Sequence, residues 1–428
     1  MNYTEALAYL ESLGTFGIQL GLKRIEALLT EMGNPERAFR SIHVTGTNGK
    51  GSTTALLASI LNAAGIRTGM YISPHLVDYP ERMQLDGQEI SQADFALAIC
   101  RTKVAAEAIQ TAGMESPTEF EVLTAAAFYW FASQRAEMVV VEVGLGGLLD
   151  STNVIVPEMS LITNVTLEHT DRCGSTLAEI AAHKAGIIKP GVPVVTGASG
   201  EALAVIEAKA AETRSDCRVL NRDFFVSDYS CNSSELSFAL TIGAAQPQTY
   251  HTRLLGRHQA DNAALAVCAC QWLSEQEPRL TLAAIQAGVA EATWPGRFEV
   301  FRESPLVILD GAHNPDGIRT LRQTLDDVYP ARPIVFLFGV LADKDHAAMA
   351  RILFRLCDRV VVVRPNSQRA AAAADIADEI AAGAVEAIAA DSIAAGLAQA
   401  RSWAGTEGIV CVAGSLYMIG EARQLLRQ

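Results

Sequence analysis

Short apolar runs alternate along the chain with longer segments in which apolar residues recur at helical spacing. Strand-like runs in the first half lie at 41–46, 137–144, 159–165 and 192–197. Segment 116–136, between two of these runs, has a helical pattern. Strands that alternate with helices in this way predict a mainly parallel sheet covered by helices.

The middle of the chain is more polar. Residues from about 214 to 253 predict a small antiparallel piece, and a helix is predicted at 256–276. In segment 291–301, Trp-Pro-Gly is predicted to interrupt two helical segments and to mark a domain boundary. The expected organisation is a domain at 1–292, a hinge at 293–298 and a domain at 299–428.

The alternation of strands and helices restarts after this boundary. Each candidate strand is followed by a predicted helix, which is typical of a compact Rossmann-like unit. The alanine-rich tract 370–400 predicts two helices around a short strand. The candidate strands are 305–310, 333–338, 359–363, 384–389 and 408–414.

The composition narrows the class of protein. The 428 residues, 50% of them hydrophobic, suffice for a large core and favour two or three domains. The net charge of −14 argues against a general nucleic-acid surface, so an anionic ligand needs a local positive site. No apolar stretch reaches the roughly 18 residues of a membrane span, and the acidic, amphipathic start does not resemble a signal peptide. The 8 cysteines lack metal-type spacing, which favours reduced thiols in a cytoplasmic protein.

The stretch HVTGTNGKGST, residues 43–53, places glycines and a lysine between an apolar run and a helix-like segment. Glycine inside an element costs about 0.5–1 kcal/mol relative to alanine, so a compensating role is expected. Backbone N–H groups that converge at a helix N-terminus favour a phosphate. Lys50 would then reach terminal phosphates, and a hydroxyl of Ser52 or Thr53 would hold magnesium. Gly51 departs from the literal P-loop spacing, and an ordinary glycine-rich turn is the alternative.

Three further residues suit a nucleotide and metal site. Glu142 ends an apolar run, where a carboxylate at the sheet edge can hold magnesium; a solvated strand end is the alternative. His169 follows another apolar run and can ligate a metal, although magnesium prefers oxygen; a helix-start or core histidine is the alternative. Lys184 would ordinarily be an exposed helix lysine before its Gly186 cap.

These residues belong to a series of motifs that resembles the Mur ligase superfamily, and within it the folylpolyglutamate synthase/dihydrofolate synthase family. The resemblance runs nearly end to end. Its motifs, in chain order, are HVTGTNGKGST, SPHL followed by ER, TEFEVLTAAAF, EVGLGG with LDSTN, HKAGIIKPGVPVV, GRHQADNAALA, PGRFEV, LDGAHNPDG, GVLADKD and GSLYMIGE.

The resemblance implies an α/β protein with an N-terminal P-loop ATPase-type parallel sheet domain and a C-terminal Rossmann-like α/β domain, with the active site in the cleft. It implies an ATP-dependent ligase that adds L-glutamate to a folate through an acyl phosphate, with dihydropteroate as an open second substrate. The implied ligands are ATP, one or two Mg²⁺ ions, L-glutamate, and folate or dihydropteroate. We expect a cytoplasmic monomer without nucleic-acid or membrane partners.

The resemblance also implies roles for individual residues. Positions that match catalytic residues are Lys50, Lys184, Arg297 and His313. Those that match ATP-contacting residues are Thr47, Asn48, Gly49, Lys50, Gly51, Ser52, Thr53, Asn262, Arg297 and Asp310. Those that match magnesium ligands are Ser52, Ser73, Glu142, His169 and Lys184, the last as a carbamate. The implied folate side comprises Thr118, Glu119, Phe120, Glu121, Leu149, Asp150 and Ser151, with Leu20–Leu22 as further candidates, and the implied glutamate side comprises His313 and Ser415.

Two positions depart from the family pattern. Leu148 stands where an arginine is expected, and Glu168 stands where an aspartate precedes the histidine. The leucine removes an anion contact near the pteroate side. This affects the expected substrate preference but not the ligase chemistry.

Two other functions fit parts of the sequence. A cell-wall Mur ligase would use the same chemistry on a nucleotide-linked sugar peptide. Such enzymes usually carry an extra N-terminal domain, and a loop that begins at Gly46 is expected to leave no room for one. A non-ligating P-loop nucleotide-binding protein would explain the loop but not LDGAHNPDG or GVLADKD.

Overall fold

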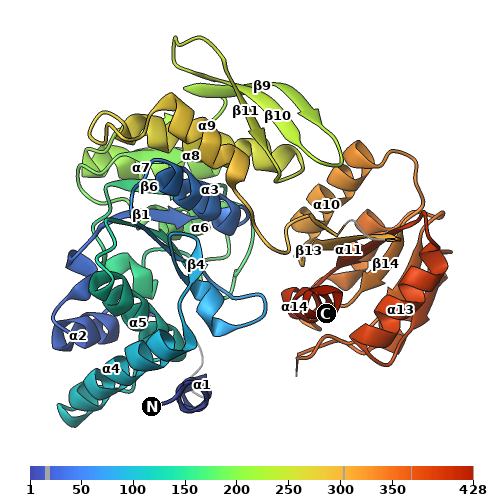
Figure 1. Ribbon diagram of the computed structural model, residues 1–428, viewed down its shortest axis with the longest axis horizontal. Helices are drawn as coiled ribbons and strands as arrows, with labels where there is room; N and C mark the ends of the chain where they lie inside the picture. The colour runs from blue at the N-terminus through green and yellow to red at the C-terminus, as the bar shows by residue number, and fades with distance from the viewer. Residues whose placement is uncertain (15–19, 302–303, 368, 428) are drawn as a thin grey trace. The chain divides into compact units, whose positions relative to one another are not determined.

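The computed structural model describes residues 1–14, 20–301, 304–367 and 369–427 (Figure 1). The chain divides into two compact units. The first comprises 1–228, 238–251 and 260–292, and the second comprises 229–237, 252–259 and 293–428. Two short segments before residue 292 thus group with the second unit, which the hydrophobic pattern did not indicate. Within the described ranges, no helix is long and apolar enough to cross a membrane.

The first unit contains an eight-stranded sheet in the order β4-β3-β2-β5-β1-β6-β7-β8. All its pairs are parallel except those of β3 with β2 and with β4. The four strands predicted in the first half are confirmed as β1, β5, β6 and β7, and β1 lies near the centre of the sheet. The strands are β1 (Arg40–Thr45), β2 (Thr68–Tyr71), β3 (Met83–Leu85), β4 (Gln88–Glu89), β5 (Met138–Glu142), β6 (Met159–Ile162), β7 (Val194–Thr196) and β8 (Cys217–Val219).

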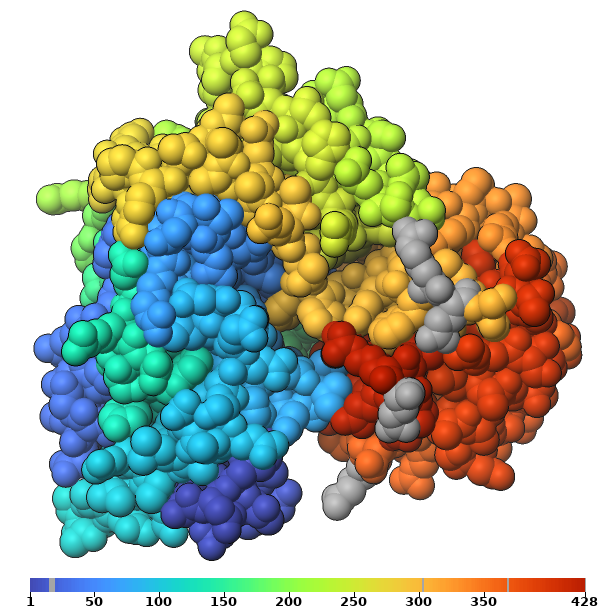
Figure 2. Space-filling view, viewed as in Figure 1, coloured from blue at the N-terminus to red at the C-terminus, as the bar shows by residue number. Residues whose placement is uncertain are grey.

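Helices before residue 292 cover this sheet (Figure 1). Helix α3 contacts β1, β2 and β5. A second layer of α1, α2, α4 and α5 forms one core with Val139 and Val141 of β5, and Figure 2 shows α1 in dark blue and α4 in cyan at the surface. The helices are α1 (Tyr3–Leu13), α2 (Lys23–Glu31), α3 (Lys50–Ala63), α4 (Gln92–Thr111), α5 (Glu119–Ser133), α6 (Leu177–Ala185), α7 (Gly200–Thr213), α8 (Arg257–Leu273) and α9 (Leu282–Glu291), with short 3₁₀ turns η2 (Pro35–Arg37), η3 (Tyr79–Arg82) and η4 (Ser151–Val154).

The polar stretch predicted at 214–253 contains a small three-stranded sheet. Its order is β11-β10-β9, so that strands consecutive in the chain are neighbours. Its strands are β9 (Phe224–Cys231), β10 (Leu236–Ile242) and β11 (Gln248–Thr252).

The second unit is built on a six-stranded sheet in the order β12-β13-β17-β14-β15-β16. All pairs are parallel except β12 with β13. The five predicted strands, each followed by a helix, are confirmed, as are the two helices around a strand in the alanine-rich tract. The elements are β12 (Glu299–Phe301), β13 (Leu306–Asp310), α10 (Pro315–Val328), β14 (Val335–Phe338), α11 (His346–Leu353), β15 (Arg359–Val362), α12 (Ala373–Ala382), β16 (Glu386–Ala389), α13 (Ile393–Ala404), β17 (Ile409–Ala413) and α14 (Leu416–Arg427).

The prediction that Trp-Pro-Gly separates two helical segments is wrong on one side. Helix α9 does precede it, but the residues that follow form strand β12. Val300 lies opposite Ile308 of β13 in an antiparallel register. Pairing with β13 along the sheet edge satisfies backbone groups of this short strand.

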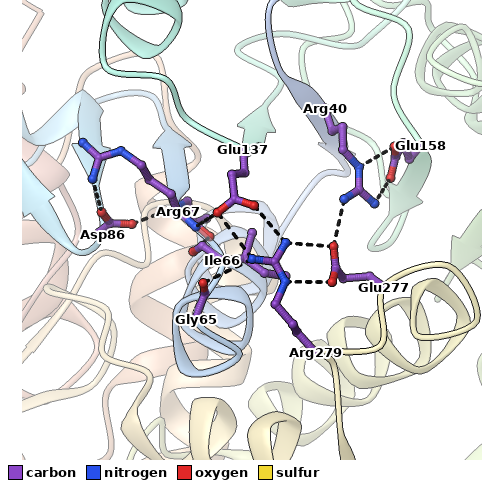
Figure 3. Close-up of polar contacts among 10 residues, drawn as sticks. Arg40, Gly65, Ile66, Arg67, Asp86, Glu137, Glu158, Glu277 and Arg279 are labelled. Atoms are coloured by element: carbon purple, nitrogen blue, oxygen red, sulfur yellow. Dashed lines mark hydrogen bonds and ion pairs between the residues drawn. The ribbon is translucent and has the colours of Figure 1, made fainter.

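An ion-pair network joins the starting ends of four strands of the first sheet (Figure 3). Arg40 begins β1 and pairs with Glu158, just before β6, and with Glu277. Arg279 pairs with Glu277 and with Glu137, just before β5. Glu137 also accepts a hydrogen bond from the backbone of Arg67, just before β2. This edge is opposite the one where ligands bind in parallel α/β sheets, so the network serves stability.

Replacing Glu277 with glutamine is expected to lower the stability of the first unit at pH 7. Hydrogen bonds from Arg279 lower the pKa of Glu277 to about 2 from 4.5. A carboxylate with a depressed pKa in the folded state contributes its full stabilisation above the unfolded pKa and loses it as the pH falls towards the folded pKa. We expect a loss of about 0.5–1.5 kcal/mol, with solvent screening keeping it small.

Calorimetric melting of wild type and Glu277→Gln from pH 7 down to pH 3 measures this effect. The difference should shrink as the pH falls below about 4.5. Glu291→Gln removes an exposed carboxylate of the same unit and serves as the control. A difference that stays constant with pH, or one equal to that of the control, contradicts the assignment.

Candidate functional site

The turn between β1 and α3 is a close-packed glycine loop. Gly46 has φ 154° and Gly49 has φ 83°, both in the region that favours glycine. A Cβ atom on Gly46 would lie 1.8 Å from Thr163 Oγ1, and one on Gly49 would lie 2.4 Å from Asn262 Oδ1. The neighbours therefore approach the backbone more closely than any side chain would allow, which explains the glycines without reference to a ligand.

The end of strand β6 holds this loop in place. Thr47 N donates to Asn164 O at 3.0 Å, and Asn48 N donates to Asn164 Oδ1 at 2.9 Å. Thr163 Oγ1 donates in turn to Asn48 O at 2.6 Å. Sequence reasoning missed Thr163 and Asn164; the signal that would have found them is two polar residues directly after an apolar strand next to β1.

Helix α3 presents its N-terminus to the loop without a side-chain cap. Its first-turn N–H groups and dipole suit an anion. Lys50 folds back over the loop, with Nζ donating to Gly46 O at 2.9 Å and to Thr47 O at 3.0 Å. Ser52 and Thr53 are buried in the first turn. The uncapped, lysine-bearing helix start favours a phosphate site over an ordinary turn.

Glu142 and Ser73 lie together at the same edge of the sheet. Glu142 is the last residue of β5, the neighbour of β1, and is buried. Its Oε2 accepts a hydrogen bond from Ser73 N at 3.2 Å. The alternative of a solvated strand end is therefore wrong for Glu142.

Lys184 is not an exposed helix lysine. It lies in the last turn of α6, capped by Gly186, with only 5% of its surface exposed. Burial, reinforced by the positive charge of Lys50, lowers the pKa of Lys184 to about 7. With this pKa, a substantial fraction of the amine is neutral at pH 7, and a neutral amine is a nucleophile. The influence of Lys50 places Lys184 near the phosphate loop.

His169 lies in the loop after β6 and is exposed. Its φ of 52° places it in the left-handed region, and its carbonyl accepts hydrogen bonds from Arg172 N and Cys173 N, both at 2.9 Å. The alternative that His169 is a helix-start or core histidine is therefore wrong. Glu168, beside it, contributes to the electrostatics of Lys184.

The loop that follows Glu142 carries the predicted folate-side residues 149–151. Asp150 is buried, which raises its pKa, and four hydrogen-bond donors oppose this rise. Leu145 N donates to Asp150 Oδ2 at 2.8 Å, and Thr152 N donates to Oδ1 at 3.0 Å. Asp150 therefore organises the loop, whereas Leu149 is partly exposed and Ser151 is buried.

The other predicted folate-side segment forms the start of α5. Thr118 and Glu121 form a capping box, and Glu121 also pairs with Arg24 of α2 at 3.1 Å. Glu119 accepts a hydrogen bond from Tyr79 OH at 2.8 Å, and Phe120 stacks on Tyr71 with ring centroids 6.3 Å apart. Of the candidates Leu20–Leu22, only Leu22 belongs to a defined element boundary, the N-cap of α2.

Asn262 belongs to α8 of the first unit. The remaining predicted residues lie in the second unit and are Arg297, Asp310, His313 and Ser415. Asp310 ends β13 and accepts hydrogen bonds from Phe298 N and Ala312 N, both at 2.9 Å. Burial raises its pKa, and the positive charge of Arg297 opposes this rise. A Cβ on Gly311 would lie 3.0 Å from Arg297 NH1, so the guanidinium lies against this turn.

Two polar side chains flank the same turn. His313 Nδ1 lies 2.8 Å from Gly311 O. Ser415 is buried just before α14, and its hydroxyl has no hydrogen-bond partner among the described residues. A hydroxyl at the start of a helix is suited to an acceptor such as a carboxylate.

The donor set in the first unit suits a hard cation. Ser52 and Ser73 supply hydroxyl oxygens and Glu142 supplies a carboxylate, which are ligands that Mg²⁺ prefers. No cluster of three or more His, Cys, Asp or Glu residues that would bind a metal occurs in the part of the chain described. Such a cation would thus depend on oxygens of a bound phosphate, as in other phosphoryl-transfer sites.

Comparison with known proteins places both units in one family. The Mur ligase middle domain matches residues 44–270, and the Mur ligase, glutamate ligase domain, matches residues 296–416. Folylpolyglutamate synthase of Lacticaseibacillus casei is 39% identical over 374 residues, covering 86% of this chain and 87% of that protein. Dihydrofolate synthase/folylpolyglutamate synthase of Bacillus subtilis is 34% identical over 442 residues, covering 99% of each. Mycobacterium tuberculosis folylpolyglutamate synthase complexed with ADP superposes with a TM-score of 0.91 at 31% identity, covering 100% of this chain and 99% of that one.

Replacing Asn164 with alanine is expected to weaken nucleotide binding while the sheet stays intact. The substitution removes the acceptor for Asn48 N and leaves the loop less ordered before a nucleotide arrives. We expect the dissociation constant for ADP to rise about fivefold to thirtyfold, equivalent to about 1–2 kcal/mol. Isothermal titration calorimetry measures it.

Asn232→Ala is the matched control, because Asn232 Oδ1 also accepts a backbone hydrogen bond, from Ser234 N at 2.8 Å, in an exposed turn between β9 and β10. Equal ADP affinities for the two variants would show that Asn164 does not order the loop.

Proposed function

The chain belongs to the folylpolyglutamate synthase/dihydrofolate synthase family of Mur ligases, and on that premise we propose how its residues perform the reaction. It is an ATP-dependent ligase that joins L-glutamate to a folate. The observation that supports the proposed ATP site most strongly is the uncapped start of α3 behind the glycine loop, with Lys50 folded across it. The loop amides and Lys50 bind the ATP phosphates in this proposal.

The reaction needs activation because a carboxylate is a poor acyl donor. ATP transfers its terminal phosphoryl group to the folate carboxylate, giving an acyl phosphate and ADP. The glutamate amine then attacks the acyl carbon, and phosphate leaves as the amide forms. Lys50 would offset the negative charge that gathers when a phosphoryl group approaches a carboxylate. Arg297 keeps its predicted catalytic role. In the second unit, His313 and Ser415 are proposed to position the incoming glutamate.

We propose that magnesium accompanies ATP in the first unit. Ser52, Ser73 and Glu142 would hold it through oxygen, with His169 as a further predicted ligand. The ion would neutralise phosphate charge. Burial of Glu142 beside Ser73 supports this set, because it keeps a carboxylate in place at the strand end next to the loop.

Lys184 is proposed to carry a carbamate. Its neutral amine attacks CO₂, the new N–C bond forms and a proton is released, leaving an anionic carbamate. Burial supports this chemistry because it disfavours the ammonium form. The change of sign also turns the repulsion between Lys184 and Lys50 into attraction.

Carbon-13 NMR of the protein equilibrated with ¹³C-bicarbonate is expected to show one carbamate resonance that Lys184→Arg abolishes. Lys189→Arg is the control, since Lys189 is also partly buried and has a lowered pKa. The resonance should persist in the control. Its absence from wild type, or its persistence in Lys184→Arg, would refute the carbamate.

Several properties stay predictions. A cytoplasmic location agrees with eight free cysteines, and the net charge of −14 agrees with the lack of a nucleic-acid partner. A monomeric state rests on the family resemblance. Whether dihydropteroate is also a substrate is open, because the relative from L. casei is named for one activity and that from B. subtilis for two.

Purified enzyme assayed with ATP, Mg²⁺ and glutamate on tetrahydrofolate and on dihydropteroate in parallel tests the proposal. Amide formation coupled to ADP release is expected, and Lys50→Ala should abolish it while the protein stays folded. ADP binding without amide formation would favour a non-ligating nucleotide-binding protein. Ligation of a sugar-peptide precursor instead would favour a cell-wall ligase.

Leu148→Arg is expected to improve the use of dihydropteroate selectively. The leucine side chain is 47% exposed, and its backbone is held by His183 O at 2.7 Å, so a longer side chain has room to extend. A charge-assisted contact with the pteroate carboxylate is worth about 1.5–3 kcal/mol, which is about tenfold to a hundredfold in kcat/KM. Wild type should use a folate that already bears glutamate better than dihydropteroate.

Val156→Arg adds the same charge at a position that is 78% exposed and serves as the control. Equal kcat/KM ratios for the two substrates in wild type and Leu148→Arg would show that Leu148 does not set the preference.

A further inference from the structure

A chain of buried side-chain hydrogen bonds runs from the centre of the first sheet to the loop after Glu142. His43 Nε2 lies 2.9 Å from Thr152 Oγ1, and Thr152 Oγ1 donates to Asp150 Oδ1 at 2.5 Å. All three side chains are buried. His43 lies within β1, which pairs with β5 on one side and β6 on the other.

The direction of these hydrogen bonds follows from the number of protons. The Thr152 hydroxyl has one proton, and it points to the Asp150 carboxylate. The hydroxyl oxygen then accepts from His43, which places the imidazole proton on Nε2. His43 Nδ1 is buried without a hydrogen-bond partner among the described residues, which suits an unprotonated nitrogen. Burial lowers the pKa of His43 to about 3, so the ring is neutral.

Asp150 connects the hydrogen bonds of His43 and Thr152 to the loop. It accepts hydrogen bonds from Leu145 N and Thr152 N and so closes the backbone between these two residues. Two further hydrogen bonds fix the middle of the loop: Thr45 Oγ1 donates to Gly146 O at 2.6 Å, and Leu148 N donates to His183 O at 2.7 Å. The loop therefore has one defined conformation before a substrate binds.

We propose that His43 is a positioning residue that sets the affinity for folate by holding loop 144–152 through Thr152 and Asp150. This inference rests on the proposed function, in which residues 149–151 belong to the folate side. Fixing the loop in advance reduces the conformational entropy that folate binding must overcome.

Nucleotide binding should depend far less on this chain of hydrogen bonds. The phosphate loop is held separately, by Thr163 and Asn164 at the end of β6. A defect in the chain should thus appear in the KM for folate before it appears in ADP affinity. A general loss of stability would instead affect the KM for folate and the affinity for ADP together.

Thr152→Val removes the hydroxyl and leaves the volume of the side chain almost unchanged. We expect the KM for tetrahydrofolate to rise about tenfold or more, and the fall in kcat and the change in ADP dissociation constant to stay within about twofold. Thr68→Val is the matched control, because Thr68 is an equally buried threonine of the same sheet whose hydroxyl donates to Ile66 O at 2.8 Å, away from the loop. Equal KM values for the two variants would overturn the proposal.

A second pair of variants tests the histidine if Thr152→Val does not fold. His43→Gln keeps an N–H donor near the place of Nε2, whereas His43→Leu removes it. The glutamine variant should keep a KM for tetrahydrofolate close to that of wild type, and the leucine variant should raise it. The proposal fails if the two variants have the same KM.

Nitrogen-15 NMR of histidine-labelled wild type gives a readout that does not depend on activity. Comparison with His43→Gln assigns the signals, and the Nε2–H form is expected at pH 7. An Nδ1–H form would overturn the hydrogen-bond direction. By contrast, a wild type that binds ADP but ligates neither folate nor dihydropteroate would refute the proposed function and leave the Nε2–H result standing.

Discussion

The close approach of backbone and side chains at the end of β1 is the constraint on which the candidate site depends. Gly46 and Gly49 have Thr163 and Asn262 against them at distances that no Cβ would tolerate. This packing draws the ends of β1 and β6 and the start of α8 around one turn. Helix α3 begins directly after the turn, so its amides converge where a phosphate can be bound. The positive charge of Lys50, at the start of this helix, adds to the effect of burial in lowering the pKa of Lys184.

The two ends of the strands in the first sheet have different roles, one in stability and the other in the candidate site. At the starting edge, arginines and carboxylates pair with one another, and their charges are satisfied within the protein. At the other edge, Glu142 and Lys184 are buried. Burying charge is costly unless it is compensated. At this edge, the proposed phosphate and metal ligands would add to that compensation.

Many residues that the family resemblance assigns to the substrate also have structural roles. Asp150 closes its own loop, and Thr118 with Glu121 caps α5. These two roles are compatible, because a side chain that is already fixed presents its neighbours to a ligand with little loss of entropy. The same reasoning extends to buried residues behind the site, such as His43. Their effect on binding is transmitted through hydrogen bonds rather than through contact.

The sequence by itself determined the fold class, the strands of both main sheets that are continuous apolar runs, and the identity of the glycine loop. These features are local: an apolar run or a glycine pattern carries its signal within a few residues. The short strands β2, β3, β4 and β12 were not predicted, because two to four residues carry too little periodicity to be recognised. The resemblance supplied the family and the candidate residues, but not their surroundings.

Only the tertiary structure decided which of those residues are buried and what they touch. From the sequence alone, Lys184 is expected to be an ordinary helix lysine. Its lowered pKa arises from the segments packed around it in the folded protein. Asn164, 116 residues from Asn48, holds the phosphate loop through a hydrogen bond, and His43 reaches Thr152 across a separation of 109 residues. Burial, electrostatic neighbours and hydrogen-bond partners are properties of packing between remote parts of the chain. No local pattern encodes them, which is why the sequence pointed to the site but not to the residues that hold it in place.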